Sequence, residues 1–188
     1  MIAILVVLCE VAFWVLLAAG LALRYVARKP RLGAAVLLCE PLLEVVLLVV
    51  TVIDLRNGAE PDWKHGLAAV YIGFTVGLGH HTIKWVDAQV AHRWFGGPPP
   101  VKPKYGMARA AHEWRTAARW TLAAVVALGL LQAAIWYVGP GDGISSLRGW
   151  QQKMGLVIGI NLIIAGSYTF FPKQAPKGAV ERESADRL

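Results

Sequence analysis

Residues 32–53, LGAAVLLCEPLLEVVLLVVTVI, form an apolar run that is long enough to cross a lipid bilayer as one helix. An α-helix rises about 1.5 Å per residue, so about 20 residues span the roughly 30 Å of hydrocarbon in a bilayer. The chain contains further runs of this kind at residues 2–23, 66–86, 120–138 and 154–171. This pattern predicts an all-α fold, a polytopic helical membrane protein whose five transmembrane helices form a single membrane domain over residues 1–188.

The composition and the distribution of charge favour the same class of protein. Hydrophobic residues make up 56% of the chain, above the roughly 45–50% of soluble domains. The net charge of +7 would suit nucleic acid, but 15 of the 19 Lys and Arg residues fall on one side of the bilayer if the N-terminus is outside. The positive-inside rule accounts for this asymmetry. We therefore expect an N-out, C-in, multi-pass protein of the cytoplasmic (inner) membrane, with no nucleic-acid partner.

Three glutamates lie within the first two apolar runs, at Glu10, Glu40 and Glu44. A carboxylate is costly to bury in a bilayer, so an intramembrane glutamate usually has a function. Counting about 1.5 Å per residue from the outer helix end places Glu10 about 12 Å deep and Glu44 about 15 Å deep. Glu40 lies about 21 Å deep, at the level expected for His80 and His81 of the third run. We take these five residues as candidates for proton exchange.

Two amides extend the outer polar layer that Glu10 and Glu44 would form. Gln132 and Asn161 are expected about 9 and 10 Å from the outer surface, where they would give polar support. A structural alternative applies to all of these groups. Polar side chains often form hydrogen bonds between membrane helices without any further function, and a position at the inner interface suits the two histidines equally well.

Small residues and one proline predict how the helices approach one another. Ala69, Gly73, Gly77 and His81 recur at every fourth position, which places them on one helix face and allows a second helix to come close. His81 is therefore expected to face a partner helix. Pro41 removes a backbone donor, so it should kink the second helix.

The connection at residues 87–119 is expected on the cytoplasmic side. Its proline-rich centre, residues 96–104, cannot be helical and should be extended. Residues 108–119 then read as an amphipathic helix on the inner membrane surface, with Trp114 towards lipid. Its basic face would contact anionic lipid headgroups through Arg109, Arg115 and Arg119. Residues 172–188 should form a cytoplasmic tail.

The sequence contains no signature of a metal site or a cofactor. Glu40 and Glu44 lie on a helix without histidine, and no EExxH or HExxH spacing is present. Cys9 and Cys39 form no CxxC pair, and no GxSxG motif indicates a serine nucleophile. We therefore expect no metal and no cofactor.

The stretch from His92 to Gly106, HRWFGGPPPVKPKYG, together with the composition, resembles that of uncharacterised small polytopic membrane proteins of high-GC Gram-positive bacteria. The resemblance implies a cytoplasmic-membrane location and no particular activity.

The leading functional hypothesis is proton-linked transport or ion passage, because carboxylates and a histidine at successive depths would form a relay across the bilayer. Five helices are few for a complete carrier, so we expect a homo-oligomer or a membrane partner subunit. One alternative is a membrane-embedded enzyme acting on an isoprenoid, quinone or lipid, in which a glutamate donates a proton. Another is a non-catalytic scaffold or assembly protein. An aqueous path would favour transport, and an apolar cavity ending at a carboxylate would favour the enzyme. A closed dry core would favour the scaffold.

Overall fold

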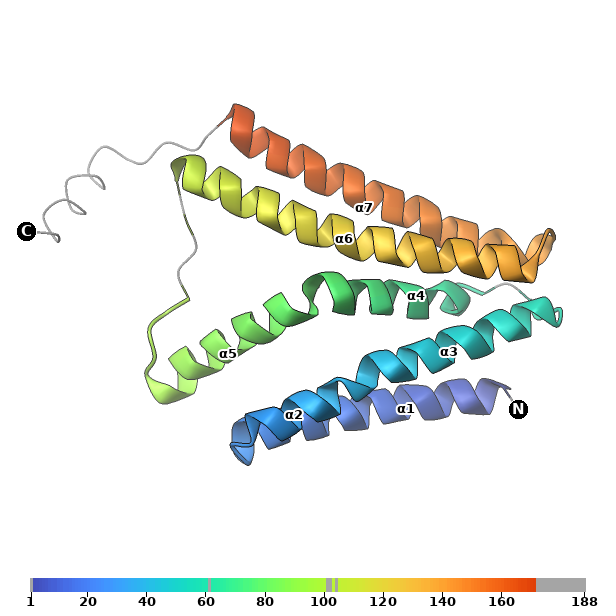
Figure 1. Cartoon of the computed structure of the whole chain (residues 1–188), viewed down its shortest axis with the longest axis horizontal. Helices are drawn as coiled ribbons and strands as arrows, with labels where there is room; N and C mark the ends of the chain where they lie inside the picture. The colour runs from blue at the N-terminus through green and yellow to red at the C-terminus, as the bar shows by residue number, and fades with distance from the viewer. Residues whose placement is uncertain (1, 61, 101–102, 104, 172–188) are drawn as a thin grey trace, which may run out of the picture.

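The computed structural model describes residues 2–60, 62–100, 103 and 105–171, the side chains of residues 2–6, 10, 94 and 95 excepted. In this part of the chain every regular element is helical, which confirms the all-α prediction. The helices lie side by side, with the start of α1 and the α3–α4 and α6–α7 connections at one end (Figure 1). The α1–α2 turn, the α5–α6 connection and the end of α7 lie at the other. The predicted tail, residues 172–188, lies outside the described residues.

The first two predicted spans form a helical hairpin. Helix α1 (Ile2–Leu21) continues into a π-helical turn, η1 (Ala22–Val26), and the chain then reverses into α2 (Pro30–Leu37) and α3 (Cys39–Arg56). The break between α2 and α3 falls at Leu38 because Pro41 has no N–H to donate to the carbonyl of Leu37, four residues earlier. The kink predicted from this proline is thus confirmed. Helix α1 packs against both α2 and α3.

The third predicted span is a helical stretch interrupted by a π-helical turn. Helix α4 (Lys64–Phe74) leads through η2 (Thr75–Gly79) into α5 (His80–Phe95), and Figure 1 shows the stretch bending at η2. The predicted small-residue contact is present. A Cβ atom at Gly73 would overlap the carbonyl oxygen of Ala123, and one at Gly77 would lie 2.6 Å from the carbonyl oxygen of Arg119. Helix α4 therefore packs closely against α6.

His81 does not lie on the buried face that the small residues Ala69, Gly73 and Gly77 form. A π-helical turn contains more residues than an α-helical one, so the face presented by the chain rotates after η2. Both His80 and His81 are exposed. Gly155 and Gly159 have the same spacing on the last helix, but a Cβ atom at either position would meet nothing within 4 Å among the described residues.

The last two spans differ from the expected boundaries. Helix α6 runs without interruption from Gly106 to Val138, so residues 108–119 belong to its N-terminal part and do not form a separate surface helix. The sequence around the expected boundary between Arg119 and Trp120 contains no glycine or proline that would end a helix. Its many alanines favour continuation of the helix. The glycine–proline turn after Val138 ends α6. The 3-10 turn η3 (Asp142–Ile144) then precedes α7 (Ser145–Phe170), which begins nine residues before the expected position at residue 154.

Among the described residues, four helical segments are long and apolar enough to cross a membrane: Val7–Val26, Pro30–Arg56, Gly106–Val138 and Asp142–Phe170. The expected fifth span at residues 66–86 is not among them. The π-helical turn η2 divides it, and the polar residues His80, His81 and Lys84 follow. The count of five spans and the N-out orientation stay predictions.

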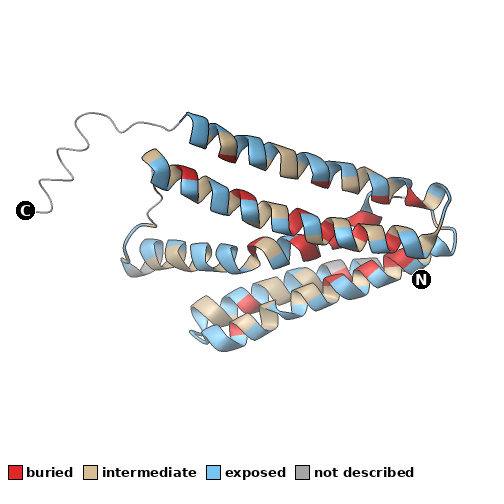
Figure 2. Ribbon diagram, turned by 45° about the horizontal axis from the view of Figure 1, so that its top comes forward, coloured by how far each residue is buried: buried red, intermediate tan, exposed pale blue. Residues whose placement is uncertain are grey.

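The buried core lies where α3, α4, α6 and α7 meet (Figure 2). Ala68 and Ala69 of α4 are fully buried there, as are Leu131 of α6 and Leu147 of α7. Large apolar side chains cover much of the outer surface, as expected for helices surrounded by lipid. The tight core on one side of α4 leaves the opposite side of that helix to form a cavity.

Candidate functional site

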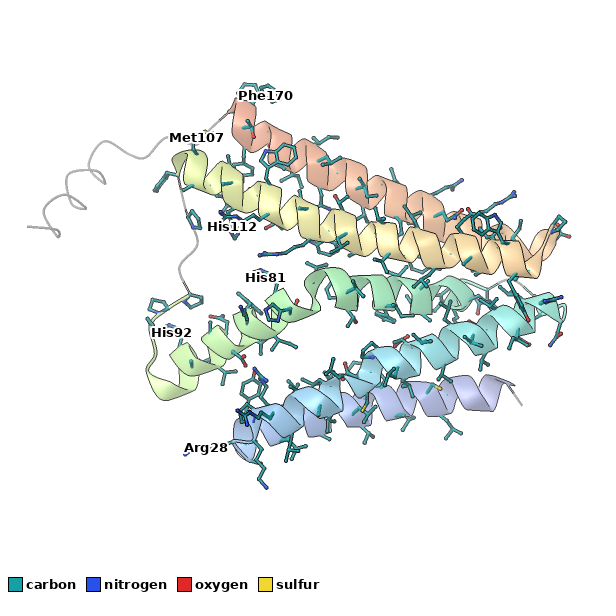
Figure 3. All side chains as sticks on the ribbon, viewed as in Figure 1. Arg28, His81, His92, Met107, His112 and Phe170 are labelled. Atoms are coloured by element: carbon teal, nitrogen blue, oxygen red, sulfur yellow. The ribbon has the colours of Figure 1, made fainter. Side chains whose placement is uncertain are left out.

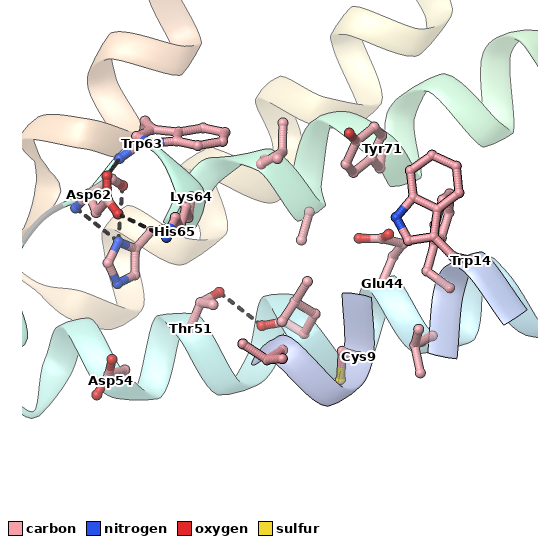
Figure 4. Close-up of a pocket in the computed structure, with 16 residues that line it drawn as sticks. Cys9, Trp14, Glu44, Thr51, Asp54, Asp62, Trp63, Lys64, His65 and Tyr71 are labelled. Carbon is pink, nitrogen blue, oxygen red and sulfur yellow. Dashed lines mark hydrogen bonds and ion pairs between the residues drawn. The ribbon is translucent and has the colours of Figure 1, made fainter. Parts of the chain in front are cut away.

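A cavity of about 530 Å³ lies along α3, flanked by α1 and α4 (Figure 4). Its volume falls within the roughly 300–1,000 Å³ of typical small-molecule sites. The apolar part of its lining comes from Val7, Phe13, Trp14, Leu43, Leu47, Leu67, Ala68 and Tyr71. Carboxylate and other polar groups are contributed by Glu44, Thr51, Asp54, Asp62, Lys64 and His65.

Glu44 is the acidic residue at the apolar end of the cavity. Its side chain is buried, with a relative exposure of 6% for the residue, and its Oε2 atom has no hydrogen-bond partner among the described residues. Buried polar atoms in proteins almost always have such a partner, so an exception calls for an explanation. In Figure 4 the carboxylate points towards the rings of Trp14 and Tyr71. Glu44 can therefore offer an acceptor oxygen to a proton or a ligand in the cavity.

Three aromatic rings surround this end of the cavity. Phe13 stacks on Tyr71 with 6.3 Å between ring centroids and an interplanar angle of 23°. Phe13 also meets Trp14 edge to face at 5.7 Å. The contact between Phe13 and Tyr71 joins α1 to α4. Trp14 and Tyr71 remain 67% and 46% exposed, so parts of both side chains are accessible outside the protein core.

The other end of the cavity is polar and lies at the α3–α4 connection. Asp54 is ten residues from Glu44 on the same helix, which corresponds to about 15 Å along its axis. Asp62 accepts a hydrogen bond from the backbone N–H of Trp63 at 2.6 Å and lies 4.0 Å from Lys64 Nζ. The buried His65 places its Nδ1 atom 3.0 Å from the backbone nitrogen of Asp62. The cavity is thus amphipathic, with one apolar and aromatic end and one charged end.

The other predicted proton-exchange residues lie outside this lining. Glu40 is half-buried one turn before Glu44, and its Oε1 atom also has no hydrogen-bond partner in the described part of the chain. The side chain of Glu10 lies outside the described residues. His80 and His81 follow η2 and are exposed. Figure 3 places His81, with His92 and His112, towards the end of the molecule where α5 and α6 are connected. The cavity therefore contains Glu44 but neither of these two histidines.

The two predicted supporting amides have separate partners. Gln132 of α6 accepts a hydrogen bond at 3.0 Å from Gln151 of α7, a residue that the depth argument did not single out. Asn161 donates at 2.8 Å to the carbonyl oxygen of Val157 on its own helix. The lining of the Glu44 cavity includes neither amide. Gln132 thus joins two helices and does not extend the Glu44 site.

The three arginines expected at lipid headgroups have different environments. Arg109 pairs with Glu113 at 2.6 Å and lies over the ring of Tyr168, so its charge is already engaged within the protein. Arg115 is exposed and Arg119 half-buried. The opposite face of this segment, expected towards lipid, instead buries Ala110 and Ala117 within the protein. Trp114 is half-exposed and donates to Thr169 of α7 at 2.9 Å.

An ion pair that sequence reasoning missed joins the α1 hairpin to α5. Arg24 of η1 pairs with Asp87, and the hydroxyl of Tyr25 donates to the same carboxylate at 2.7 Å. The hydrogen bond from Arg24 holds the pKa of Asp87 below its ordinary value, although burial partly opposes the shift. Positions 24 and 87 directly follow two predicted spans, so the sequence indicated that both lie near a membrane surface. Nothing in the sequence paired them.

The described residues contain no group of three or more His, Cys, Asp or Glu side chains that could hold a metal ion.

The sequence analysis also did not predict the aromatic side of the cavity. Trp14 is four residues from Glu10, and Tyr71 is four residues from Leu67, so each could have been placed on a helix face. Which faces meet depends on the packing of three helices, and no local pattern specifies it.

The fold and the cavity define a helical membrane protein with a carboxylate at the apolar end of an amphipathic cavity. The chain is 35% identical over 179 residues to the uncharacterised membrane protein YmcC of Bacillus subtilis (strain 168), and the alignment covers 95% of this chain and 96% of the relative. The chain therefore belongs to the same family as YmcC, and it is a membrane protein with transmembrane helices. No family model and no solved structure matches the chain.

Proposed function

We propose that this protein couples proton binding at Glu44 to the passage of a small molecule or ion across the cytoplasmic membrane. The observation that carries the proposal is the buried Glu44 carboxylate, which has an unpartnered oxygen and faces a cavity large enough for a small molecule. Intramembrane carboxylates in such positions commonly belong to proton or substrate pathways.

The surroundings of Glu44 support reversible proton exchange. The ionisable groups that line the same cavity are Cys9 of α1, Asp54 of α3, Asp62 of the connection, and Lys64, His65 and Tyr71 of α4. Asp54, Asp62 and His65 lie at the polar end, and Asp54 is about 15 Å from Glu44 along the axis of α3. The Asp54 and Asp62 side chains are only partly buried there, whereas Glu44 lies beside aromatic rings. Glu40, one helical turn further along, is the candidate for the inner half of the pathway.

The orientation of the cavity follows from the proposed topology. With the N-terminus outside, the α3–α4 connection is outside, and the polar end of the cavity lies on that side. Single cysteines at Ala59 or Ser145, in a Cys9→Ala, Cys39→Ala background, should then react with a membrane-impermeant maleimide on intact cells. A cysteine at Ala179 should react after permeabilisation. Labelling of position 179 on intact cells would reverse the orientation.

A homo-oligomer or a partner subunit is part of the proposal, because one chain of this size offers few helices around a complete pathway. The inner end is expected to contact anionic headgroups through Arg115, since this side chain is exposed. Arg109, which is paired with Glu113, contributes less to that contact.

The direct test is proton flux in proteoliposomes. Purified protein is reconstituted with an internal pH-sensitive dye, and a potassium gradient with valinomycin supplies the driving force. We expect flux for the wild type and a loss of at least about tenfold for Glu44→Gln, which preserves shape but removes the proton-binding carboxylate. Glu60→Gln makes the same chemical change in an exposed loop and serves as the control. Equal flux for Glu44→Gln and wild type would refute the role of Glu44.

One observation favours the enzyme alternative as a second candidate. The cavity is largely apolar and contains a buried carboxylate, as a site for a lipid or isoprenoid would. The nearest hydroxyl on the same helix, that of Thr51, donates to backbone carbonyl oxygens at 2.9 and 3.0 Å and is thereby engaged. Incubation with a total lipid extract, followed by mass spectrometry, tests this candidate. A lipid product that requires Glu44, without proton flux, would favour the enzyme.

A further inference from the structure

We propose that the cavity between α1, α3 and α4 binds an amphipathic organic cation, with its charged group at Glu44 and its apolar groups among Phe13, Trp14 and Tyr71. This inference rests on the proposed function and specifies its substrate class. The structure places a buried carboxylate and three aromatic rings at the same end of one cavity.

The charges of the cavity favour a cation over an anion. Glu44, Asp54 and Asp62 are carboxylates, whereas Lys64 is the single Lys or Arg among the described lining residues. Lys64 lies 4.0 Å from Asp62 at the polar end, and its side chain is 56% exposed. The apolar end therefore has a carboxylate and no basic side chain within the described lining. An anionic ligand there would meet Glu44 without a compensating charge.

The chemistry of the donors favours an organic cation over a metal ion. Hard cations such as Ca²⁺ take about six to eight oxygen ligands. The described residues offer no cluster of three ligating side chains, and Figure 4 shows Glu44 beside the rings of Trp14 and Tyr71. A substituted ammonium needs one opposite charge and apolar or aromatic contacts. Aromatic faces attract such a cation through cation–π interactions worth about 0.5–2 kcal/mol.

The same carboxylate explains how proton and cation would be linked. An ionised, unpaired carboxylate is costly to bury, so Glu44 requires a compensating partner. A bound cation can be this partner, and a proton takes its place when the cation is absent. The two ligands therefore compete for Glu44, and entry of one cation releases one proton.

Titration calorimetry of the purified full-length protein in detergent tests the inference with two cations of different size, benzyltrimethylammonium and tetraphenylphosphonium. Tetraphenylborate, which has nearly the same shape as tetraphenylphosphonium but a negative charge, is the matched control. We expect at least one cation to bind and tetraphenylborate not to bind. Glu44→Gln should weaken cation binding at least about tenfold, and Glu44→Asp, which keeps the charge, should retain part of it.

Tryptophan variants give a second control within the chain. Trp14→Leu should weaken cation binding several-fold, whereas Trp136→Leu should not, because Trp136 is 77% exposed and lies outside the cavity lining. Failure of both cations to bind, equal binding of tetraphenylborate, or undiminished binding to Glu44→Gln would overturn the inference.

Repeating the titration in buffers of different ionisation enthalpy counts the protons released, and it separates the two proposals. Cation binding without proton release would keep the inference and refute proton coupling. Proton flux that depends on Glu44, with neither cation bound, would keep the proposed function and refute the substrate class.

Discussion

The two sides of α4 differ sharply in how closely they are packed. One side presents Ala69 and Gly73 to the core, where Ala69 is fully buried and a Cβ atom at Gly73 would overlap α6. The opposite side presents Leu67 and Tyr71 to a cavity of about 530 Å³. One helix therefore combines a rigid contact with an open site. The rigid contact holds α4, and Tyr71 with it, against α6.

This difference indicates that the cavity is a feature of the fold and not the result of loose packing throughout. The protein packs α4 on α6 without room for a methyl group, so equally dense packing beside α3 would be possible for the same fold. Instead, that space contains a carboxylate with an unpartnered oxygen. The following predictions test the contrast between the packed side and the open side, in order of decreasing effect.

The largest effect is expected at the packed side. Gly73→Val should lower the free energy of unfolding by about 3 kcal/mol or more, because overpacking of a dense contact typically costs about 1–3 kcal/mol and here backbone must move. The measurement is thermal unfolding in detergent. Gly159→Val is the control, since it makes the same change in a helix where a Cβ atom meets nothing within 4 Å. Equal destabilisation by both variants would mean that helix propensity, not the α4–α6 contact, sets the cost.

A smaller effect is expected at the ion pair that joins the α1 hairpin to α5. Asp87→Asn removes the ion pair with Arg24 and should cost about 1 kcal/mol, because the Asp87 side chain is 36% exposed and solvent screens the interaction. Asp142→Asn, at an exposed position, should cost nothing measurable.

The same ion pair predicts a pH dependence. Arg24 lowers the pKa of Asp87 in the folded protein, so the charged carboxylate stabilises the fold. This contribution is fully present above the unfolded pKa of about 3.9 and is lost as the pH falls through the lower folded value. The wild type should therefore lose its advantage over Asp87→Asn below about pH 4. An advantage that persists undiminished at lower pH would contradict the assignment.

A still smaller effect is expected from the amide pair between α6 and α7. A double-mutant cycle with Gln132→Leu and Gln151→Leu should give a coupling free energy of about 0.6 kcal/mol, the average for hydrogen bonds between membrane helices. Asn161→Leu should show no coupling to Gln132→Leu, because Asn161 bonds to its own helix. Coupling of equal size in both cycles would place Asn161 in the same polar contact.

The smallest effect on stability is expected at Glu44. Glu44→Leu should leave the free energy of unfolding unchanged or slightly increased, because it removes a buried carboxylate that lacks a full set of partners. A loss of more than about 2 kcal/mol would show that Glu44 holds helices together, which is the structural alternative. The unfolding assay used for Gly73→Val also makes this measurement.

The sequence by itself determined the class of protein and several local features. Apolar runs specify membrane helices because the bilayer requires every backbone group to be bonded within the segment. The kink before Pro41 and the close approach at Gly73 and Gly77 were also predictable, since each depends on a missing donor or a missing side chain at one position. Four of the predicted runs coincide with helices that are long and apolar enough to span a membrane.

The tertiary structure alone decided which buried groups share a site. Estimated depth placed Glu44 with Gln132 and Asn161, but depth does not specify the rotation of a helix about its axis. The π-helical turn η2 rotates the face that carries His81, and the packing of α4 against both α3 and α6 places Tyr71 beside Glu44. A site between three helices depends on these rotations, and they follow from contacts between residues far apart in the chain.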